Sequence, residues 1–83
     1  MDQRRELKRE ALARDGGCVG ARLVRFVPCM GQYDLDEIRP RARGGSPLDL
    51  ENVQILCRAH HEWKHANPIT ARERGLTTHS WEG

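Results

Sequence analysis

The sequence is poor in the residues from which a hydrophobic core is built. Leu, Ile, Val and Phe number only 16 of its 83 residues, and aromatic residues make up 5%. Such a low share is typical of disordered chains, but those carry a high net charge, whereas the formal net charge here is only +2. A domain this short usually needs a disulfide, a metal ion or a partner to stay folded. We therefore expect a cross-link that replaces part of the core.

The chain also lacks an even set of cysteines and any long apolar run. Its three cysteines cannot all pair, and no signal peptide is expected, so a secreted disulfide framework is disfavoured and metal ligation is the better use of the thiols. No apolar run approaches the roughly 20 residues that cross a bilayer, which excludes a membrane-spanning protein. We expect a protein of the cytoplasm.

Lysine is scarce, with two residues against twelve arginines, and the planar guanidinium of arginine suits bidentate contacts with phosphate. The 12 acidic residues nearly balance these charges, so net charge alone does not identify a nucleic-acid-binding protein. Three arginines gather in a segment that Pro and paired Gly keep out of regular structure: Arg39, Arg41 and Arg43. This segment is interpreted either as a phosphate-binding loop or as a solvated basic turn.

Apolar periodicity predicts a small α+β domain without repeats or a linker. The expected order is a helix over 3–14, an irregular loop with a short extended piece over 18–30, a strand over 33–38, the basic loop, a strand over 53–56, a helix over 57–66 and a short helix ending near 74. Most residues of metal-ligand type fall where these elements join.

The helix over 57–66 carries two sets of candidate metal ligands. One set has the composition of a closed zinc site, which contributes folding energy: Cys18, Cys29, Cys57 and His60. The other set is His61 and His65, one helical turn apart, so that both imidazoles can reach one ion. The alternatives are buried thiols for the first set and a solvated helix face for the second.

A longer pattern links these sets. The run Asp36-Glu37-Ile38-x-Pro40-Arg41-x-Arg43-Gly44-Gly45-Ser46 is followed by Asn52 and, nine residues later, by His61. Together with the Ala-Arg-Asp-Gly-Gly-Cys exit of the first helix and the Cys-x2-His-His helix, this resembles the HNH endonuclease family over roughly residues 4–76. The resemblance implies a zinc-stabilised ββα-metal (treble-clef-like) finger with flanking helices, forming a single domain over 1–83.

The resemblance also implies roles for individual residues. Asp36 and His61, joined by His65 as in some branches, would bind a catalytic divalent ion such as Mg²⁺, Mn²⁺ or Ni²⁺. Asn52 would hold the long loop through side-chain to backbone hydrogen bonds. Members with a zinc knuckle place their structural zinc ligands where this chain has Cys18, Cys29, Cys57 and His60.

Glu37 departs from the family pattern, because the first His, which activates water, usually stands at this position. A carboxylate is ionised at neutral pH but is a weaker base than imidazole. Glu37 is therefore open to three interpretations: general base, additional metal ligand, or sign of lost activity. Phage and actinobacterial members include Asp-Glu-Ile versions, which favours a branch variant and an active enzyme.

The function implied is metal-dependent hydrolysis of DNA phosphodiester bonds, by nicking or by double-strand cleavage, with Arg39, Arg41 and Arg43 on flanking phosphates. DNA is the implied partner, and phage members of this size suggest packaging (terminase) proteins as further partners, in the host cytoplasm if the chain is phage-encoded. The alternative, from a different class, is a catalytically inactive zinc module that binds DNA or a protein.

Overall fold

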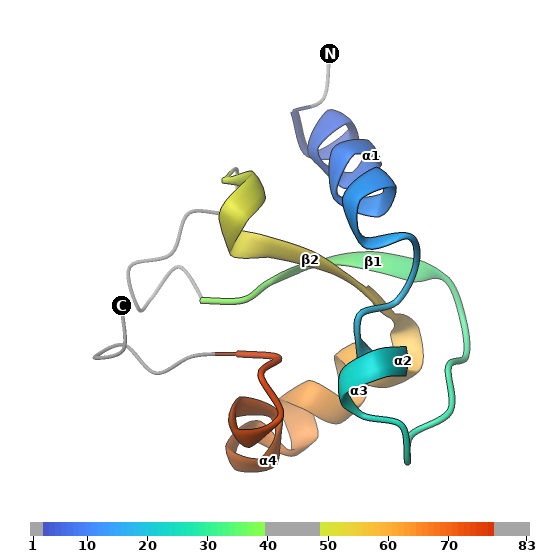
Figure 1. Cartoon of the computed structure of the whole chain (residues 1–83), viewed down its shortest axis with the longest axis vertical. Coiled ribbons are helices and arrows are strands. Elements are labelled where there is room, and N and C mark those ends of the chain that lie inside the picture. Colours follow the sequence, from blue (N-terminus) through green and yellow to red (C-terminus); the bar gives the residue numbers. More distant parts are fainter. Residues whose placement is uncertain (1–2, 40–48, 78–83) are drawn as a thin grey trace.

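A two-stranded antiparallel sheet lies between two groups of helices in the computed structural model of the chain, which describes residues 3–39 and 49–77 (Figure 1). The elements in chain order are α1 (Gln3–Asp15), α2 (Gly20–Leu23), β1 (Tyr33–Glu37), the 3-10 helix η2 (Leu50–Asn52), β2 (Val53–Cys57), α3 (Arg58–Ala66) and α4 (Pro68–Glu73). The expected small α+β class is therefore confirmed. Within these described ranges, no helix has the length and apolar content needed to cross a membrane.

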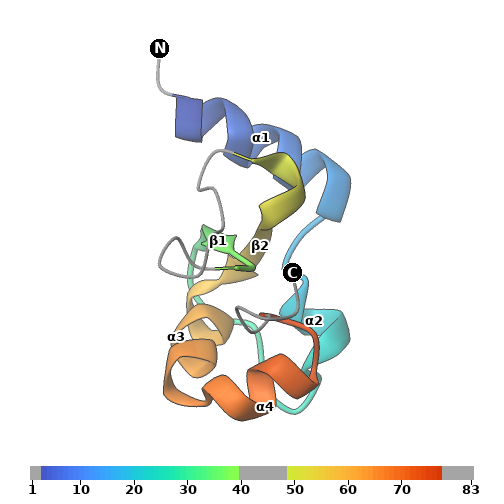
Figure 2. The same cartoon turned by 90° about the vertical axis from the view of Figure 1, so that its left-hand side faces the viewer.

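The sheet divides the hydrophobic core into two small clusters, one on each face. Val53 and Ile55 of β2 pack with Leu7 and Ala11 of α1. On the opposite face Leu56 packs with three buried residues of the other helices and their flanks, namely Val24, Ala71 and Leu76. The two-residue alternation of a strand produces this division. Figure 2 shows the same layers from the side, with α1 on one side of the sheet and α3 and α4 on the other.

The pairing of the strands decides which side chains face α3. Asp36 pairs with Gln54 and Tyr33 with Cys57, so the acidic strand lies directly beside the strand that leads into α3. Both predicted strands are confirmed to within one residue at an end. The predicted helix over 57–66 begins one residue later, because Cys57 is its N-cap, and its Sγ accepts a hydrogen bond from the His60 amide.

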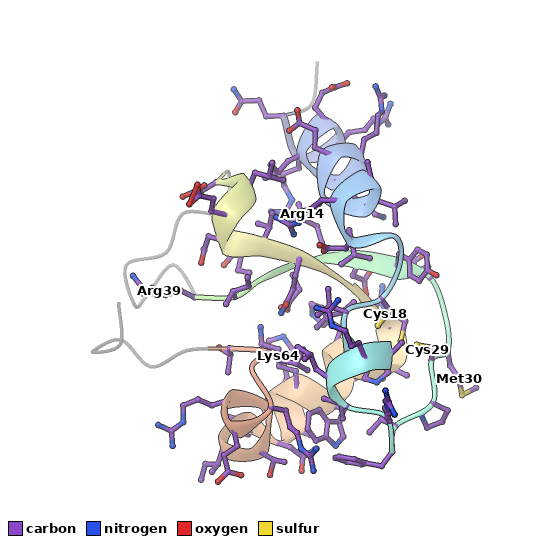
Figure 3. All side chains as sticks on the ribbon, viewed as in Figure 1. Arg14, Cys18, Cys29, Met30, Arg39 and Lys64 are labelled. Atoms are coloured by element: carbon purple, nitrogen blue, oxygen red, sulfur yellow. The ribbon has the colours of Figure 1, made fainter. Side chains whose placement is uncertain are left out.

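Two side chains at the end of α1, Arg14 and Asp15, form hydrogen bonds with the backbone of η2 and β2. Arg14, which is labelled in Figure 3, donates to the carbonyls of Leu50 and Val53, each at 2.7 Å. Asp15 Oδ2 accepts the Ile55 amide at 3.0 Å. The hydrogen bond from Arg14 is the main reason that the pKa of Asp15 is lowered from its usual value. The sequence analysis assigned no role to this pair.

The prediction for residues 18–30 was wrong in part, because this segment contains the helical turn α2 in place of a short extended piece. Four residues do not sustain a helix on their own, and tertiary contacts hold this turn. The Val19 amide donates to the Ile55 carbonyl at 2.8 Å, and Gly20 is buried against the ring of His60. No apolar period in the sequence signals such contacts.

Candidate metal centres

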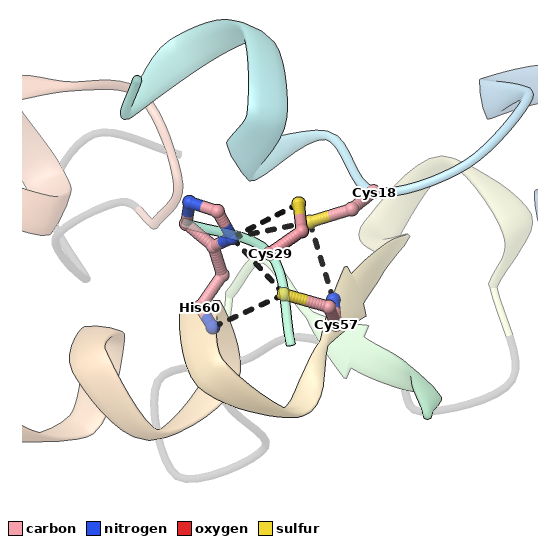
Figure 4. A group of neighbouring side chains, drawn as sticks. All are labelled: Cys18, Cys29, Cys57 and His60. Atoms are coloured by element: carbon pink, nitrogen blue, oxygen red, sulfur yellow. Dashed lines mark hydrogen bonds between the residues drawn. The ribbon is translucent and has the colours of Figure 1, made fainter. Parts of the chain in front are cut away.

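Three thiols and one imidazole converge beside the end of β2 (Figure 4). From His60 Nδ1 the distances to the Sγ atoms of Cys18, Cys29 and Cys57 are 3.4, 3.6 and 3.1 Å. In a tetrahedral zinc site, with Zn–S near 2.3 Å and Zn–N near 2.05 Å, sulfur and nitrogen ligands lie about 3.6 Å apart. The four residues therefore come together as predicted, and they could hold a metal ion such as zinc.

The backbone at the junction of β2 and α3 prepares the sulfur atoms for this role. Cys57 donates its amide to Cys18 Sγ at 3.2 Å, and Cys57 Sγ accepts the His60 amide at 3.4 Å. Amide hydrogen bonds of this kind favour the charged thiolate over the thiol. The site thus depends on the transition from strand to helix. The first turn of α3 brings the thiol of Cys57 and the imidazole of His60, three residues later, to the same side.

His60 is fixed with one ring nitrogen free for a metal. It is fully buried, and its Nε2 lies 3.0 Å from the Val24 carbonyl, which has to accept the ring N–H. The proton is thereby assigned to Nε2, and the lone pair of Nδ1 points at the three sulfur atoms. A backbone carbonyl on the second nitrogen is the usual way in which a metal-binding histidine is oriented.

The thiols differ in acidity. Burial on its own would raise the pKa of Cys57, but hydrogen bonds from the backbone of His60 and of Met30 lower it. Burial and hydrogen bonds with the other two thiols raise the pKa of Cys29 to about 12. The folded arrangement therefore favours the thiolate at Cys57 more than at Cys29.

A second group of ligand type lies between β1 and α3. Asp36, His61 and His65 offer atoms that all lie within 4.8 Å of one another. The Nε2 atoms of the two histidines are 3.2 Å apart, close to the roughly 3.3 Å that separates two imidazole nitrogens on one tetrahedral ion. His61 Nδ1 lies 3.5 Å from Asp36 Oδ1; it is buried and makes no hydrogen bond within residues 3–39 and 49–77.

Lys64 belongs to this group, although the sequence analysis overlooked it. Its Nζ donates to Asp36 Oδ2 at 2.5 Å and to the Glu37 carbonyl at 2.8 Å, and its side chain is 7% exposed. Gln54 donates to the same carboxylate oxygen at 2.8 Å. One oxygen of Asp36 is thus held by the protein, and the other faces His61. The helical period contained the signal, because it places position 64 between His60 and His61 on the inward side.

Asn52 joins the two ends of the segment that separates the strands. Its Oδ1 accepts the Arg39 amide and its Nδ2 donates to the Arg39 carbonyl, both at 2.9 Å. Contacts of this type are what the family resemblance implies for the middle Asn. Arg39 is half-buried, whereas the predicted phosphate contacts Arg41 and Arg43 lie outside the described residues.

Glu37 is half-buried and follows Asp36 directly on β1, so strand alternation directs the two side chains to opposite faces of the sheet. Its carboxylate is not a member of the group formed by Asp36, His61 and His65. Of its three interpretations, direct membership of this ligand group is therefore the one that the geometry disfavours.

Compared with protein-family models, with curated proteins and with solved structures, the chain has no match. Its function is accordingly argued from the two ligand groups and their surroundings.

Proposed function

We propose that this protein is a metal-dependent DNA endonuclease of the HNH type, built on a ββα-metal finger that a structural zinc ion stabilises. One observation supports the proposal above the others. Asp36, His61 and His65 gather between a strand and a helix, and Asn52 ties down the segment that follows that strand. This combination of ligand types, order and loop attachment is the one that the sequence resemblance leads us to expect.

The donor set fits a divalent metal ion. Asp36, His61 and His65 would hold it, because each offers one ligand atom and these atoms all lie within 4.8 Å of one another. Such an ion, when bound, supplies Lewis-acid stabilisation of the charge that develops on a phosphodiester and its leaving oxygen. Imidazole ligands favour Ni²⁺ over Mg²⁺.

The charge of the group favours binding of metal and substrate together. Asp36 contributes one negative charge, and Lys64 at 2.5 Å cancels it, so the protein alone attracts a cation weakly. A DNA phosphate would add the missing negative charge and oxygen ligands. Divalent ions are commonly held in this way, by few protein groups together with phosphate oxygens.

Glu37 would act as the general base in this proposal. Its backbone is held by Lys64 through the Glu37 carbonyl, and its side chain leaves β1 on the face opposite to Asp36. In that role the carboxylate would take the proton of the attacking water. The cytoplasmic location and a phage packaging (terminase) partner belong to the same proposal.

A second candidate function is a zinc module that binds DNA or a protein without catalysis. The ion pair between Lys64 and Asp36 favours this alternative, because it satisfies part of the carboxylate without a metal. Replacement of the usual imidazole base by Glu37 favours it as well.

Incubation of zinc-loaded protein with supercoiled plasmid and added Mg²⁺, Mn²⁺ or Ni²⁺ separates the two functions. The nuclease proposal predicts nicked or linear plasmid with at least one of these ions and none without them. If no ion supports cleavage, the zinc-module alternative stands. Unchanged cleavage by Glu37→Ala would exclude Glu37 as the general base while leaving the nuclease assignment in place.

A further inference from the structure

A cleft of about 520 Å³ opens beside β1, next to the second ligand group. It is lined by residues of α1, β1 and α3: Arg4, Arg5, Lys8, Asp34, Leu35, Arg58 and His61. Its volume is within the range of ligand-binding sites. His61 belongs both to this cleft and to the group with Asp36 and His65, so the cleft leads directly to the proposed cleavage site.

The cleft follows the outer edge of the sheet. Ile55 pairs with Leu35 across the sheet, but its amide donates to Asp15 and its carbonyl accepts from Val19. Ile55 and Leu35 therefore form a non-hydrogen-bonded pair of the antiparallel ladder. The backbone N–H and C=O of Leu35 consequently face the opposite edge, where the cleft lies. This edge adds backbone polar groups to the floor of the cleft.

Positive charge dominates the walls. Four cationic side chains line the cleft against one carboxylate, that of Asp34, which pairs with Arg58 at 3.0 Å. Arg4 and Lys8 stand one turn apart on α1, and like charges at this spacing repel each other. An anion bound in the cleft would attract both side chains and offset their mutual repulsion.

We propose that this cleft binds the phosphate backbone of DNA next to the cleavage point, so that α1 forms part of the substrate-binding surface. The inference rests on the proposed function, because the ligand is taken to be the strand whose phosphate reaches His61. Contacts by Arg and Lys with phosphates position a nucleic acid without reading its sequence. Binding through the cleft is therefore salt-dependent and independent of sequence.

The test measures binding of a fluorescent duplex oligonucleotide to zinc-loaded protein, without added catalytic ion, over a series of salt concentrations. The cleft variant Arg4→Gln/Arg5→Gln/Lys8→Gln is compared with a control that removes the same charge from exposed residues outside the cleft, Arg9→Gln/Arg22→Gln/Arg25→Gln. Zinc content and the urea midpoint establish that both variants are folded.

We expect the cleft variant to bind at least about 10-fold more weakly at low salt and to lose roughly 2–3 units of the slope of log affinity against log salt, since each lost phosphate contact removes about 0.9. The control variant should keep most of the affinity and slope. Equal effects of the two variants, or no DNA binding by the unsubstituted protein, would overturn the inference. If DNA binds through the cleft but the plasmid is not cleaved, only the proposed nuclease activity is refuted. If the plasmid is cleaved but both variants bind DNA equally well, only the inference about the cleft is refuted.

Discussion

Lys64 and Asp36 form a buried ion pair in the middle of the second ligand group. Nζ of Lys64 lies 2.5 Å from Oδ2 of Asp36, and the side chains are only 7% and 3% exposed. The lysine and Gln54 together hold one carboxylate oxygen, which leaves the other directed at His61. Lys64 is therefore a positioning residue for Asp36, and its loss has consequences that can be measured.

Substitution of Lys64→Met should destabilise the zinc-loaded protein by about 3 kcal/mol, because removing one partner leaves a buried carboxylate uncompensated. The double variant Lys64→Met/Asp36→Leu should recover at least half of this loss, since neither charge then remains. Urea unfolding of the unsubstituted protein and the two variants measures both effects. A cost below about 1 kcal/mol for the single variant would show that the pair is solvated.

Zinc removal tests the first ligand group. The protein should retain about one zinc ion per chain through purification, and a strong chelator should remove it with loss of the helical circular dichroism signal, because binding energy of a structural zinc is folding energy. Renewed zinc should restore the signal. Cys57→Ser should abolish both zinc retention and folding. A folded, cooperative protein without zinc would contradict this account.

Proton release gives the pH dependence of that centre. Zinc binds a cysteine as the thiolate, whereas a thiol with the ordinary pKa of about 8.5 is mostly protonated at neutral pH, so the cysteines must lose protons when zinc binds. Zinc affinity therefore falls as pH decreases. Calorimetric titration near neutral pH, in buffers of different ionisation enthalpy, should show at least one proton released per zinc. Release of no proton would mean that the cysteines are not ligands.

Asp15→Asn provides a control for this pH dependence. The pKa of Asp15 is lowered in the fold, so its stabilisation is present above the unfolded value near 4 and is lost as pH falls through the folded value. The difference in unfolding free energy between this variant and the unsubstituted protein should be constant between about pH 6 and 8. Changes in stability between about pH 6 and 8 can then be attributed to the zinc ligands.

Gly20 tests how closely α2 must approach the zinc centre. A Cβ atom at this position would lie 2.5 Å from two ring atoms of the fully buried His60. Gly20→Ala should therefore displace the ring, lower zinc affinity at least about 10-fold and cost about 1–3 kcal/mol of stability. Ala21→Gly, at an exposed position of the same helix, should cost about 1 kcal/mol or less and leave zinc affinity unchanged. Equal zinc affinities for the two variants would show that α2 does not constrain His60.

Local patterns in the sequence were sufficient to predict the strands, the long helices and the ligand residues on α3, whereas Asp36 was expected as a ligand only from the family resemblance. Alternation marks β1, a short run of mostly apolar residues marks β2, and the three-residue spacing of Cys57 and His60 places two ligands on one side of a helix start. These features depend on neighbours a few residues away, so the linear order contains them.

The features that escaped prediction depend on contacts between distant segments. The helical turn α2 is held by Ile55 and His60, and Arg14 reaches carbonyls 36 and 39 residues further along. The helical period places Lys64 on the inward side of α3, but its partner Asp36 lies 28 residues away in the sequence, so the ion pair itself could not be predicted. Such partners are determined by the packing of the whole domain, which short-range periodicity does not report.

The comparison of plasmid cleavage by His61→Ala and by Glu62→Ala tests the central claim most directly. Both positions lie on α3, but His61 belongs to the ligand group and Glu62 is exposed. With the metal ion that best supports the unsubstituted protein, His61→Ala should lose about 100-fold or more of the cleavage rate and keep its zinc, because the lost stabilisation amounts to several kcal/mol. Glu62→Ala should cleave at nearly the original rate. Cleavage by His61→Ala at the rate of Glu62→Ala would contradict the assignment of this group as the catalytic centre.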